Sequence, residues 1–360
     1  MFDSDKLSRL KAIGLTPHVL QRLATMHSTG AEPHLFRVTE VQREGVTLHD
    51  GEHEVGARLL PMLVTSLLAE QDAIAVGDWV LADLNAHGEW WVGGRVPPIN
   101  QIARRLHDGR DKVTRVVLVS NVDTALLVMG LDHDFNLRRL ERYLALAHLA
   151  ELDSVVVLTK ADLCDQVEER KIEVEAILPR GAGVVALNAL AEEPVEQLGP
   201  WLQPGSTVVL LGSSGAGKST LSNALIGAAV QRTGANRADD SRGRHTTTAR
   251  TLHATLPGGC IIDTPGLRTL RLDGEAEEIS GVFGDISALS AQCRFRDCRH
   301  EGEPGCAVRD AVHPERLRSF HKLMREARRD SMTALERRAQ LSMWKARGRQ
   351  AKAVGKAKRG

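Results

Sequence analysis

The sequence lacks any long apolar run. No stretch of about 18 uncharged apolar residues occurs among its 360 residues, which argues against a membrane-spanning helix. The first residues, MFDSDKLSRLK, contain no apolar segment of the kind that secretion signals carry, so we expect a cytoplasmic protein. No internal repeat is visible. Hydrophobic residues make up 42% of the chain, which suffices for two or three globular domains with a sizeable core.

Cysteine is scarce and unevenly placed. Of five cysteines, three lie within fourteen residues in the pattern C-x4-C-x-H-x5-C. Three thiolates and an imidazole form a closed tetrahedral zinc set, so we predict one structural zinc ion in place of disulfides. Buried free thiols or a redox pair are the alternatives. Cys164 and Cys260 are interpreted as core cysteines. The candidate zinc ligands are Cys293, Cys298, His300 and Cys306.

The net charge of +1 hides an asymmetry. Residues 314–360 carry 15 Lys and Arg against 4 Asp and Glu, so the rest of the chain is net acidic. Residues 336–360 are predicted to be a disordered basic tail, and Arg294, Arg296 and Arg299 add positive charge around the cysteine cluster. Basic segments follow phosphate backbones through counterion release, so we predict contact with nucleic acid.

Five short β-like segments lie between residues 35 and 100, separated by Gly, Asp and Asn turns. Five strands suggest a small barrel, and the oligonucleotide-binding (OB) barrel has that strand count. Trp79, Trp90 and Trp91 could stack on bases, but adjacent residues of a strand face opposite sides, so one of the last two is expected in the core. Residues 1–34 are a polar extension with helical patches and are assigned no role.

An alternating βα pattern follows a polar, basic connection at residues 99–112. TALLVMG, SVVVLT, AGVVAL, STVVLLG and GGCIID are typical of buried strands, and FNLRRLERYLALAHLA and VEERKIEVEAIL of helices. This alternation predicts an α/β domain with a doubly wound sheet over residues 101–280, and ligands at the carboxyl ends of its strands. An α-helical zinc domain is expected at residues 281–335.

The strongest single motif is GSSGAGKST, which follows an apolar strand and opens a helix. The spacing G-x4-G-K-[ST] is that of a phosphate-binding loop. Its glycines let backbone N–H groups turn toward the β-phosphate, helped by the helix N-terminus. Lys218 would neutralise the β- and γ-phosphates, and the Ser219 hydroxyl would ligate Mg²⁺. The loop comprises Gly212, Ser213, Ser214, Gly215, Ala216, Gly217, Lys218, Ser219 and Thr220.

A base-reading motif of the type Asn/Thr-Lys-x-Asp is missing after Lys218 and occurs upstream, as TKAD. Asp162 suits guanine, because an ionised carboxylate only accepts hydrogen bonds and guanine offers two adjacent donors on one edge. Lys160 would lay its apolar stem along the base. The backbone at the end of the next strand could close over the guanine carbonyl. The candidate base-site residues are Thr159, Lys160, Ala161, Asp162, Asn188, Ala189 and Leu190.

Two further segments complete the candidate site. In SRGRHTTTAR a threonine could reach Mg²⁺ and sense the γ-phosphate; Thr247 is favoured, while Thr246 and Thr248 remain open. In DTPG, Asp263 would hold the Mg²⁺ shell through water, and the Gly266 N–H would meet the γ-phosphate. These five segments would meet at one edge of the sheet whatever their order along the chain.

The order TKAD, GSSGAGKST, GRHTTT, DTPG, followed by the cysteine cluster, resembles the RsgA (YjeQ) family of circularly permuted, small-ribosomal-subunit-dependent GTPases. The resemblance covers residues 35–335 approximately. It implies an OB barrel, a circularly permuted GTPase domain and a zinc domain. It also implies contact with the 30S subunit and its 16S rRNA, a role in late maturation of that subunit, and GTP hydrolysis stimulated by it. We expect a monomer.

Several positions depart from common GTPase patterns. Thr159 stands where Asn is commoner, and a Thr cannot make both amide hydrogen bonds, so guanine affinity is expected to be reduced. Leu267 follows DTPG where the Ras type has a water-orienting Gln, which predicts slow intrinsic turnover. His245 is a candidate for the group that orients the attacking water in place of that Gln. GTPases that use potassium tend to carry Asn in the phosphate loop, where this chain has Gly215.

Three functions fit these patterns: a GTPase checkpoint on the small subunit, a nucleic-acid-binding module with a vestigial nucleotide site, and an ATP-using enzyme. The intact Lys218, Ser219 and Asp263 argue against the second, and Asp162 should exclude ATP.

Overall fold

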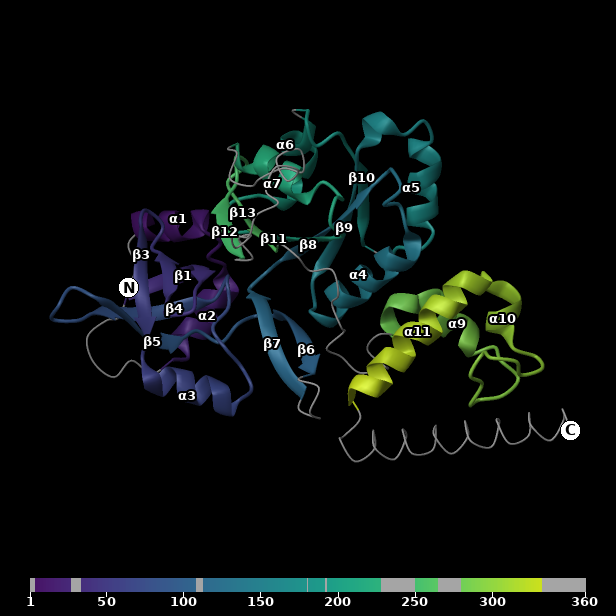
Figure 1. Ribbon diagram of the computed structural model, residues 1–360, viewed down its shortest axis with the longest axis horizontal. Coiled ribbons are helices and arrows are strands. Elements are labelled where there is room, and N and C mark those ends of the chain that lie inside the picture. Colours follow the sequence, from purple (N-terminus) through teal and green to yellow (C-terminus); the bar gives the residue numbers. More distant parts are fainter. Residues whose placement is uncertain are drawn as a thin grey trace, which may run out of the picture. The chain divides into compact units, whose positions relative to one another are not determined.

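The computed structural model describes residues 4–26, 34–107, 113–179, 181–191, 193–227, 250–264 and 280–331 (Figure 1). The chain divides into two compact units, one of Met1–Arg104 with Arg115–Leu270 and one of Arg105–Thr114 with Arg271–Gly360. This division does not separate the predicted barrel from the α/β domain, so the predicted domain boundaries stay predictions. Among the helices in the described ranges, none is both long and apolar enough to cross a bilayer.

Two short helices precede a five-stranded barrel, which confirms the predicted barrel and its strand count. The strands run in the order β1-β2-β3-β5-β4, and β4 pairs back with β1 to close the barrel. A helix that the sequence analysis missed, α3, lies between β3 and β4. The elements are α1 (Ser4–Ala12), α2 (Pro17–Ala24), β1 (His34–Val41), β2 (Val46–His49), β3 (Glu54–Leu59), α3 (Pro61–Ala69), β4 (Trp79–Leu84) and β5 (Trp90–Arg95).

The three tryptophans of the barrel differ in exposure. Trp79 is fully buried, so its predicted role as a base-stacking platform is wrong. Trp90 is half-buried and packs against the barrel core, with its ring edge to face on Phe36 at 4.9 Å between ring centroids. Trp91 lies under the Arg58 guanidinium, 5.9 Å from the ring centroid. Trp91 therefore remains the candidate for stacking.

The predicted α/β domain is confirmed, and its sheet has the order β10-β9-β8-β11-β13-β12. All pairs are parallel except β12 with β13. The strands are β8 (Thr124–Gly130), β9 (Asp153–Thr159), β10 (Gly183–Ala186), β11 (Thr207–Gly212), β12 (Thr251–Ala254) and β13 (Cys260–Asp263). The helices are α4 (Leu137–Leu149), η1 (Ala161–Leu163), α5 (Val167–Glu175), α6 (Glu193–Leu198), η2 (Gly199–Trp201) and α7 (Lys218–Ile226).

The prediction of a polar connection at residues 99–112 is wrong for residues 101–107, and residues 108–112 lie outside the described residues. Gln101–His107 forms a strand, β6, which pairs with β7 (Val113–Ser120) in a separate two-stranded sheet (Figure 1). Because β6 carries two adjacent arginines, it shows no regular apolar alternation, and its sequence does not predict a strand.

Apolar side chains at alternate positions of the buried strands pack against the helices. Leu126 and Val208 belong to a cluster that also contains Leu221 and Leu225 of α7 and Leu198 of α6. Successive side chains of a strand point to opposite faces, and α4 packs against β8 and β9. Burial of this kind contributes about 1.5–3 kcal/mol for each large apolar side chain, which keeps the strand ends and their loops in fixed positions.

The barrel and the α/β sheet share backbone pairing. β12 pairs antiparallel with β1 at Thr251 and Glu40, so one continuous sheet of eleven strands results. Arg37, which is completely buried, lies in the same region. Its guanidinium donates to the Ile13 and Asn121 carbonyl oxygens, and to Thr207 Oγ1 at 2.8 Å.

The second unit contains the helical domain that was expected around the cysteine cluster. An edge-to-face contact joins Phe283 and Phe320 at 5.3 Å, and Arg316 binds both carboxylate oxygens of Asp285 at 2.8 Å. The predicted basic tail at residues 336–360 lies outside the described residues. The elements are η4 (Gly281–Phe283), α9 (Gly284–Ser290), α10 (Ala307–Ala311) and α11 (Pro314–Ser331).

Candidate nucleotide and metal sites

Three neighbouring parallel strands end at the same edge of the sheet. Gly130 of β8 lies opposite Thr159 of β9, and Val128 of β8 lies opposite Gly212 of β11. The loops that follow these strands therefore meet. They are the β8–α4 loop at residues 131–136, the TKAD segment and the phosphate loop.

The phosphate loop has the backbone that its glycines predict. Gly212 ends β11, residues 213–217 form the loop, and Lys218 begins α7. Gly215 and Gly217 have φ angles of +84° and +91°, in the left-handed region that side-chain-bearing residues avoid. The Lys218 ammonium donates to the carbonyl oxygens of Gly212 and Ser213, at 2.8 and 2.6 Å. A phosphate would offer this ammonium group anionic acceptors at the same loop.

The base motif contacts the phosphate loop directly. Thr159 is fully buried, and its hydroxyl donates to the Ala216 carbonyl oxygen at 2.6 Å. The Lys160 ammonium donates to the Gly215 carbonyl oxygen at 2.8 Å. Lys160 has a φ of +59°, an unfavourable conformation for a residue with a side chain, which is typical of functional sites. The structure thus brings together two motifs that lie 55 residues apart in the chain.

The other base-site candidates surround this contact. Asp162 is exposed in η1, the turn that follows β9. The Leu187 N–H donates to the Leu158 carbonyl oxygen at 2.9 Å, so the ends of β9 and β10 are adjacent. Beyond this point the Asn188 side chain accepts the Leu190 N–H at 2.9 Å, and Ala189 is buried between them. The Ala161 N–H donates to the Leu187 carbonyl oxygen at 3.4 Å, so the turn that carries Asp162 contacts the residue that precedes the 188–190 segment.

The phosphate side of the site is described in part. Asp263 is buried at the end of β13, the strand beside β11. Thr264 follows it, and its hydroxyl donates to the Leu210 carbonyl oxygen at 2.7 Å, which fixes the start of the DTPG segment. The candidates His245, Thr246, Thr247, Thr248, Gly266 and Leu267 lie outside the described residues.

Two residues at this edge had not been singled out from the sequence. Asp132 accepts the Lys160 ammonium at 2.7 Å, and Asp134 accepts the Ser213 hydroxyl at 2.6 and 2.7 Å. Burial alone would raise the pKa of Asp132, but hydrogen bonds from Lys160 and from a backbone N–H outweigh it and lower that pKa. Both residues lie in the β8–α4 loop, where no spacing or motif marks them.

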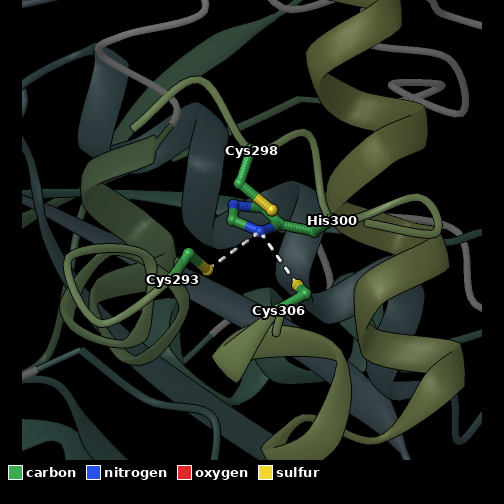
Figure 2. A group of neighbouring side chains, drawn as sticks. All are labelled: Cys293, Cys298, His300 and Cys306. Atoms are coloured by element: carbon green, nitrogen blue, oxygen red, sulfur yellow. Dashed lines mark hydrogen bonds between the residues drawn. The ribbon is translucent and has the colours of Figure 1, made fainter. Parts of the chain in front are cut away.

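The cysteine cluster is gathered in the second unit. One ligand atom from each of its four members lies within 4.8 Å of every other (Figure 2). His300 Nδ1 is 3.4 Å from Cys306 Sγ and 3.7 Å from Cys293 Sγ. Three thiolates and one imidazole are the donor set of a structural zinc site, so these residues fit that ion.

Two polar contacts support the cluster from outside. His300 Nε2 lies 3.0 Å from Ser290 Oγ, and that hydroxyl already donates to the Ile286 carbonyl oxygen at 2.8 Å. Because a hydroxyl has one proton, Ser290 accepts from Nε2–H, which leaves the Nδ1 lone pair for a metal. The Glu303 carboxylate accepts backbone N–H groups of Gly302, Arg299 and Glu301, and these bonds lower its pKa to about 2. Glu303 thus organises the loop that carries two of the ligands.

Comparison with known proteins gives a consistent result. Residues 99–273 match the model of the family described as RsgA GTPase. A protein of Xylella fastidiosa named "Small ribosomal subunit biogenesis GTPase RsgA" is 43% identical over 299 residues, covering 81% of this chain and 87% of the relative. A protein of Vibrio parahaemolyticus named "Small ribosomal subunit biogenesis GTPase RsgA 2" is 40% identical over 316 residues, covering 83% and 86%.

Two solved structures are also similar. The crystal structure of YjeQ from Thermotoga maritima has a TM-score of 0.59 at 27% identity, and covers 82% of this chain and 98% of that one. The structure of YloQ, described as a circularly permuted GTPase, has a TM-score of 0.57 at 24% identity, with 86% and 99% covered, and supports the fold alone.

Proposed function

Since this chain belongs to the RsgA family of GTPases, we propose that it acts in biogenesis of the small ribosomal subunit. It binds the 30S subunit as a monomer during late maturation and hydrolyses GTP to GDP and phosphate, with stimulation by the subunit. The observation that carries the proposal is the direct contact between the base motif and the phosphate loop, through Thr159 with Ala216 and Lys160 with Gly215.

The guanine end of the nucleotide is read by Asp162. Its carboxylate is exposed in the turn after β9. When ionised it only accepts hydrogen bonds, so it accepts from the two adjacent N–H donors of guanine. The Lys160 stem covers one face of the base, and its ammonium group keeps its bond to Gly215. The backbone at 188–190 closes over the guanine carbonyl. Adenine offers no matching pair of donors, so ATP is excluded.

The phosphates lie over the loop before α7. Backbone N–H groups of residues 213–219 point at the β-phosphate, and Lys218 moves its hydrogen bonds from loop carbonyls to β- and γ-phosphate oxygens. A bound Mg²⁺ would neutralise charge on the transferred phosphoryl group. Ser219 and Thr247 would hold that ion directly, Asp263 through water, and the Gly266 N–H would meet the γ-phosphate.

The residue that follows DTPG does not orient the attacking water. Leu267 has no polar atom with which to orient the attacking water. Intrinsic turnover is therefore slow, and His245 or a group of the ribosomal subunit supplies the missing element. In either case the subunit accelerates hydrolysis, by supplying that group or by placing His245.

Two surfaces are suited to 16S rRNA. A groove of about 480 Å³ on the barrel is lined by residues of β2, β3 and β5, among them Arg58, whose guanidinium lies over the ring of Trp91. In the second unit Phe295 is exposed with the Arg294 guanidinium over its ring, and Arg296 follows it. Accessible aromatic rings stack on unpaired bases, and arginines beside them attract phosphates. A single structural zinc ion on the four clustered ligands would hold this second surface together.

The test is GTP turnover titrated separately with small and large ribosomal subunits across a salt series. We expect stimulation by small subunits alone, and a steep loss of stimulation with salt because phosphate contacts lead the binding. Lys218→Ala should abolish turnover, while Lys171→Ala, a half-buried lysine of α5 that pairs with Glu168, should not alter it. Equal stimulation by both subunits would contradict the proposal. Turnover that is unstimulated and the same in Lys218→Ala would favour the nucleic-acid-binding module.

A further inference from the structure

Asp134 is a buried carboxylate at the nucleotide edge that belongs to no nucleotide-binding motif. It lies in the β8–α4 loop, and the residue is 8% exposed. Its two oxygens lie 2.6 and 2.7 Å from the hydroxyl of Ser213, which is the second residue of the phosphate loop. Since the hydroxyl has one proton and the carboxylate can only accept, Ser213 donates and Asp134 accepts.

Asp134 is itself held in place. Arg139 Nη2 lies 2.5 Å from Oδ1 and also donates to the Asp134 carbonyl oxygen. The Gly130 N–H donates to Oδ2 at 3.3 Å. The carboxylate is therefore fixed by the end of β8 and the first turn of α4, independently of Ser213. Arg139 also balances its charge, so that the carboxylate does not repel an anion bound at the loop.

The same loop holds the phosphate loop at a second point. Asp132 accepts the Lys160 ammonium at 2.7 Å, and Lys160 in turn donates to the Gly215 carbonyl oxygen at 2.8 Å. The Asp132 side chain also accepts the Asp134 N–H at 3.0 Å, so the two carboxylates form one rigid turn. Positions two and four of the phosphate loop are thus fixed from one neighbouring segment.

We propose that Asp134 is a positioning residue that holds the phosphate loop in its nucleotide-binding shape through the Ser213 hydroxyl. This inference rests on the proposed binding of GTP at that loop. Asp134 does not touch the nucleotide. It lowers the cost of ordering the loop when phosphate binds, so it acts on nucleotide affinity and leaves the hydrolytic step unchanged.

The test compares Ser213→Ala, Asp134→Asn and the double variant, with Ser213→Thr as the conservative replacement. Asp153→Asn, an exposed carboxylate at the opposite end of the sheet, is the matched control. Dissociation constants for a fluorescent GDP analogue should rise about tenfold in each single variant, the size that a lost charge-assisted hydrogen bond predicts. KM for GTP should rise with them, while kcat stays within about twofold.

Two results distinguish positioning from general destabilisation. Ser213→Thr keeps a hydroxyl and should bind the analogue like the wild type. The double variant should bind no more weakly than the weaker single variant, because both changes act on one hydrogen bond: Ser213→Ala removes its donor, and Asp134→Asn removes the charge of its acceptor. Additive losses, an unrescued Thr variant, or a fall in kcat with unchanged KM would each overturn the proposal.

A second measurement does not depend on nucleotide at all. In the nucleotide-free protein, hydrogen exchange of peptides spanning residues 212–220 should be faster in Ser213→Ala and Asp134→Asn than in Asp153→Asn. Unchanged exchange would overturn the role of Asp134 even if GTP binds normally. If the wild type bound no guanine nucleotide but exchange responded as expected, the positioning role would stand and the proposed function would fail.

Discussion

Replacing Arg37 by methionine should destabilise the unit that contains the barrel and the α/β sheet. Arg37 lies on β1 and is completely buried, and its partners come from three separate segments. They are the Ile13 carbonyl oxygen after α1, the Asn121 carbonyl oxygen before β8 at 3.0 Å, and Thr207 Oγ1 at the start of β11 at 2.8 Å. Methionine has similar length and fills the space over Trp79, but it donates nothing.

The expected size follows from opposing effects. Three hydrogen bonds from a charged donor contribute about 1.5–3 kcal/mol each, and their loss leaves the buried Ile13 carbonyl oxygen and the part-buried Asn121 carbonyl oxygen without this donor. Removing the buried charge recovers several kcal/mol of desolvation. Burial lowers the pKa of Arg37, and the nearby Cys260, Asp123 and Asp78 only partly offset this, in line with a large desolvation cost. A net loss of about 3 kcal/mol results, which for a unit of this size lowers Tm by roughly 6–10 °C.

The assay is thermal unfolding followed by tryptophan fluorescence, with Arg58→Met as the control. The Arg58 side chain is 63% exposed and lies 4.0 Å from Glu89, so its replacement should change Tm by no more than about 2 °C. If Arg37→Met unfolded at the wild-type temperature, the view that Arg37 joins the barrel to the α/β sheet would be refuted.

Three further predictions concern single side chains. Burial raises the pKa of Asp78 to about 6, although Arg95 opposes this. Between about pH 4 and 6 the native protein therefore keeps a proton that the unfolded chain has already released. As the pH rises through that window, the unfolding free energy of the wild type should fall by up to about 3 kcal/mol more than that of Asp78→Asn. Unfolding free energies from urea titrations that show the same pH dependence in both proteins would count against this. Ser290→Ala should weaken zinc binding about 10–100-fold in competition with a chromophoric chelator, because His300 loses the acceptor that orients its ring; unchanged affinity would speak against this contact. Thr159→Val leaves a buried phosphate-loop carbonyl without its donor and should raise the dissociation constant for GDP by about tenfold, a rise that equilibrium fluorescence either finds or rules out.

Much of the fold was predictable from the sequence because its signals are local. The buried strands β8, β9 and β11 are continuous apolar runs, and each ends in a polar or glycine-rich turn. The glycine spacing of the phosphate loop and the C-x4-C-x-H-x5-C pattern depend on backbone geometry and metal chemistry within a few residues. Such patterns are visible without knowledge of the tertiary structure.

The missed features depend on contacts between distant segments. The pairing of β12 with β1 joins residues more than 200 positions apart, and no periodicity announces it. Asp134 reaches the Ser213 hydroxyl only because parallel pairing places the end of β8 beside the start of the phosphate loop. A buried Arg37 contradicts the usual preference of arginine for the surface, so sequence patterns alone would not place it in a core.

The most direct test of the account is nucleotide selection by Asp162. Competition between GTP and XTP should be measured for the wild type and for Asp162→Asn. We expect the wild type to prefer GTP and the variant to shift toward XTP, because its amide can donate to the xanthine carbonyl. An unchanged preference for GTP in Asp162→Asn would show that guanine is not read at the end of β9, and would contradict the assignment of this permuted site.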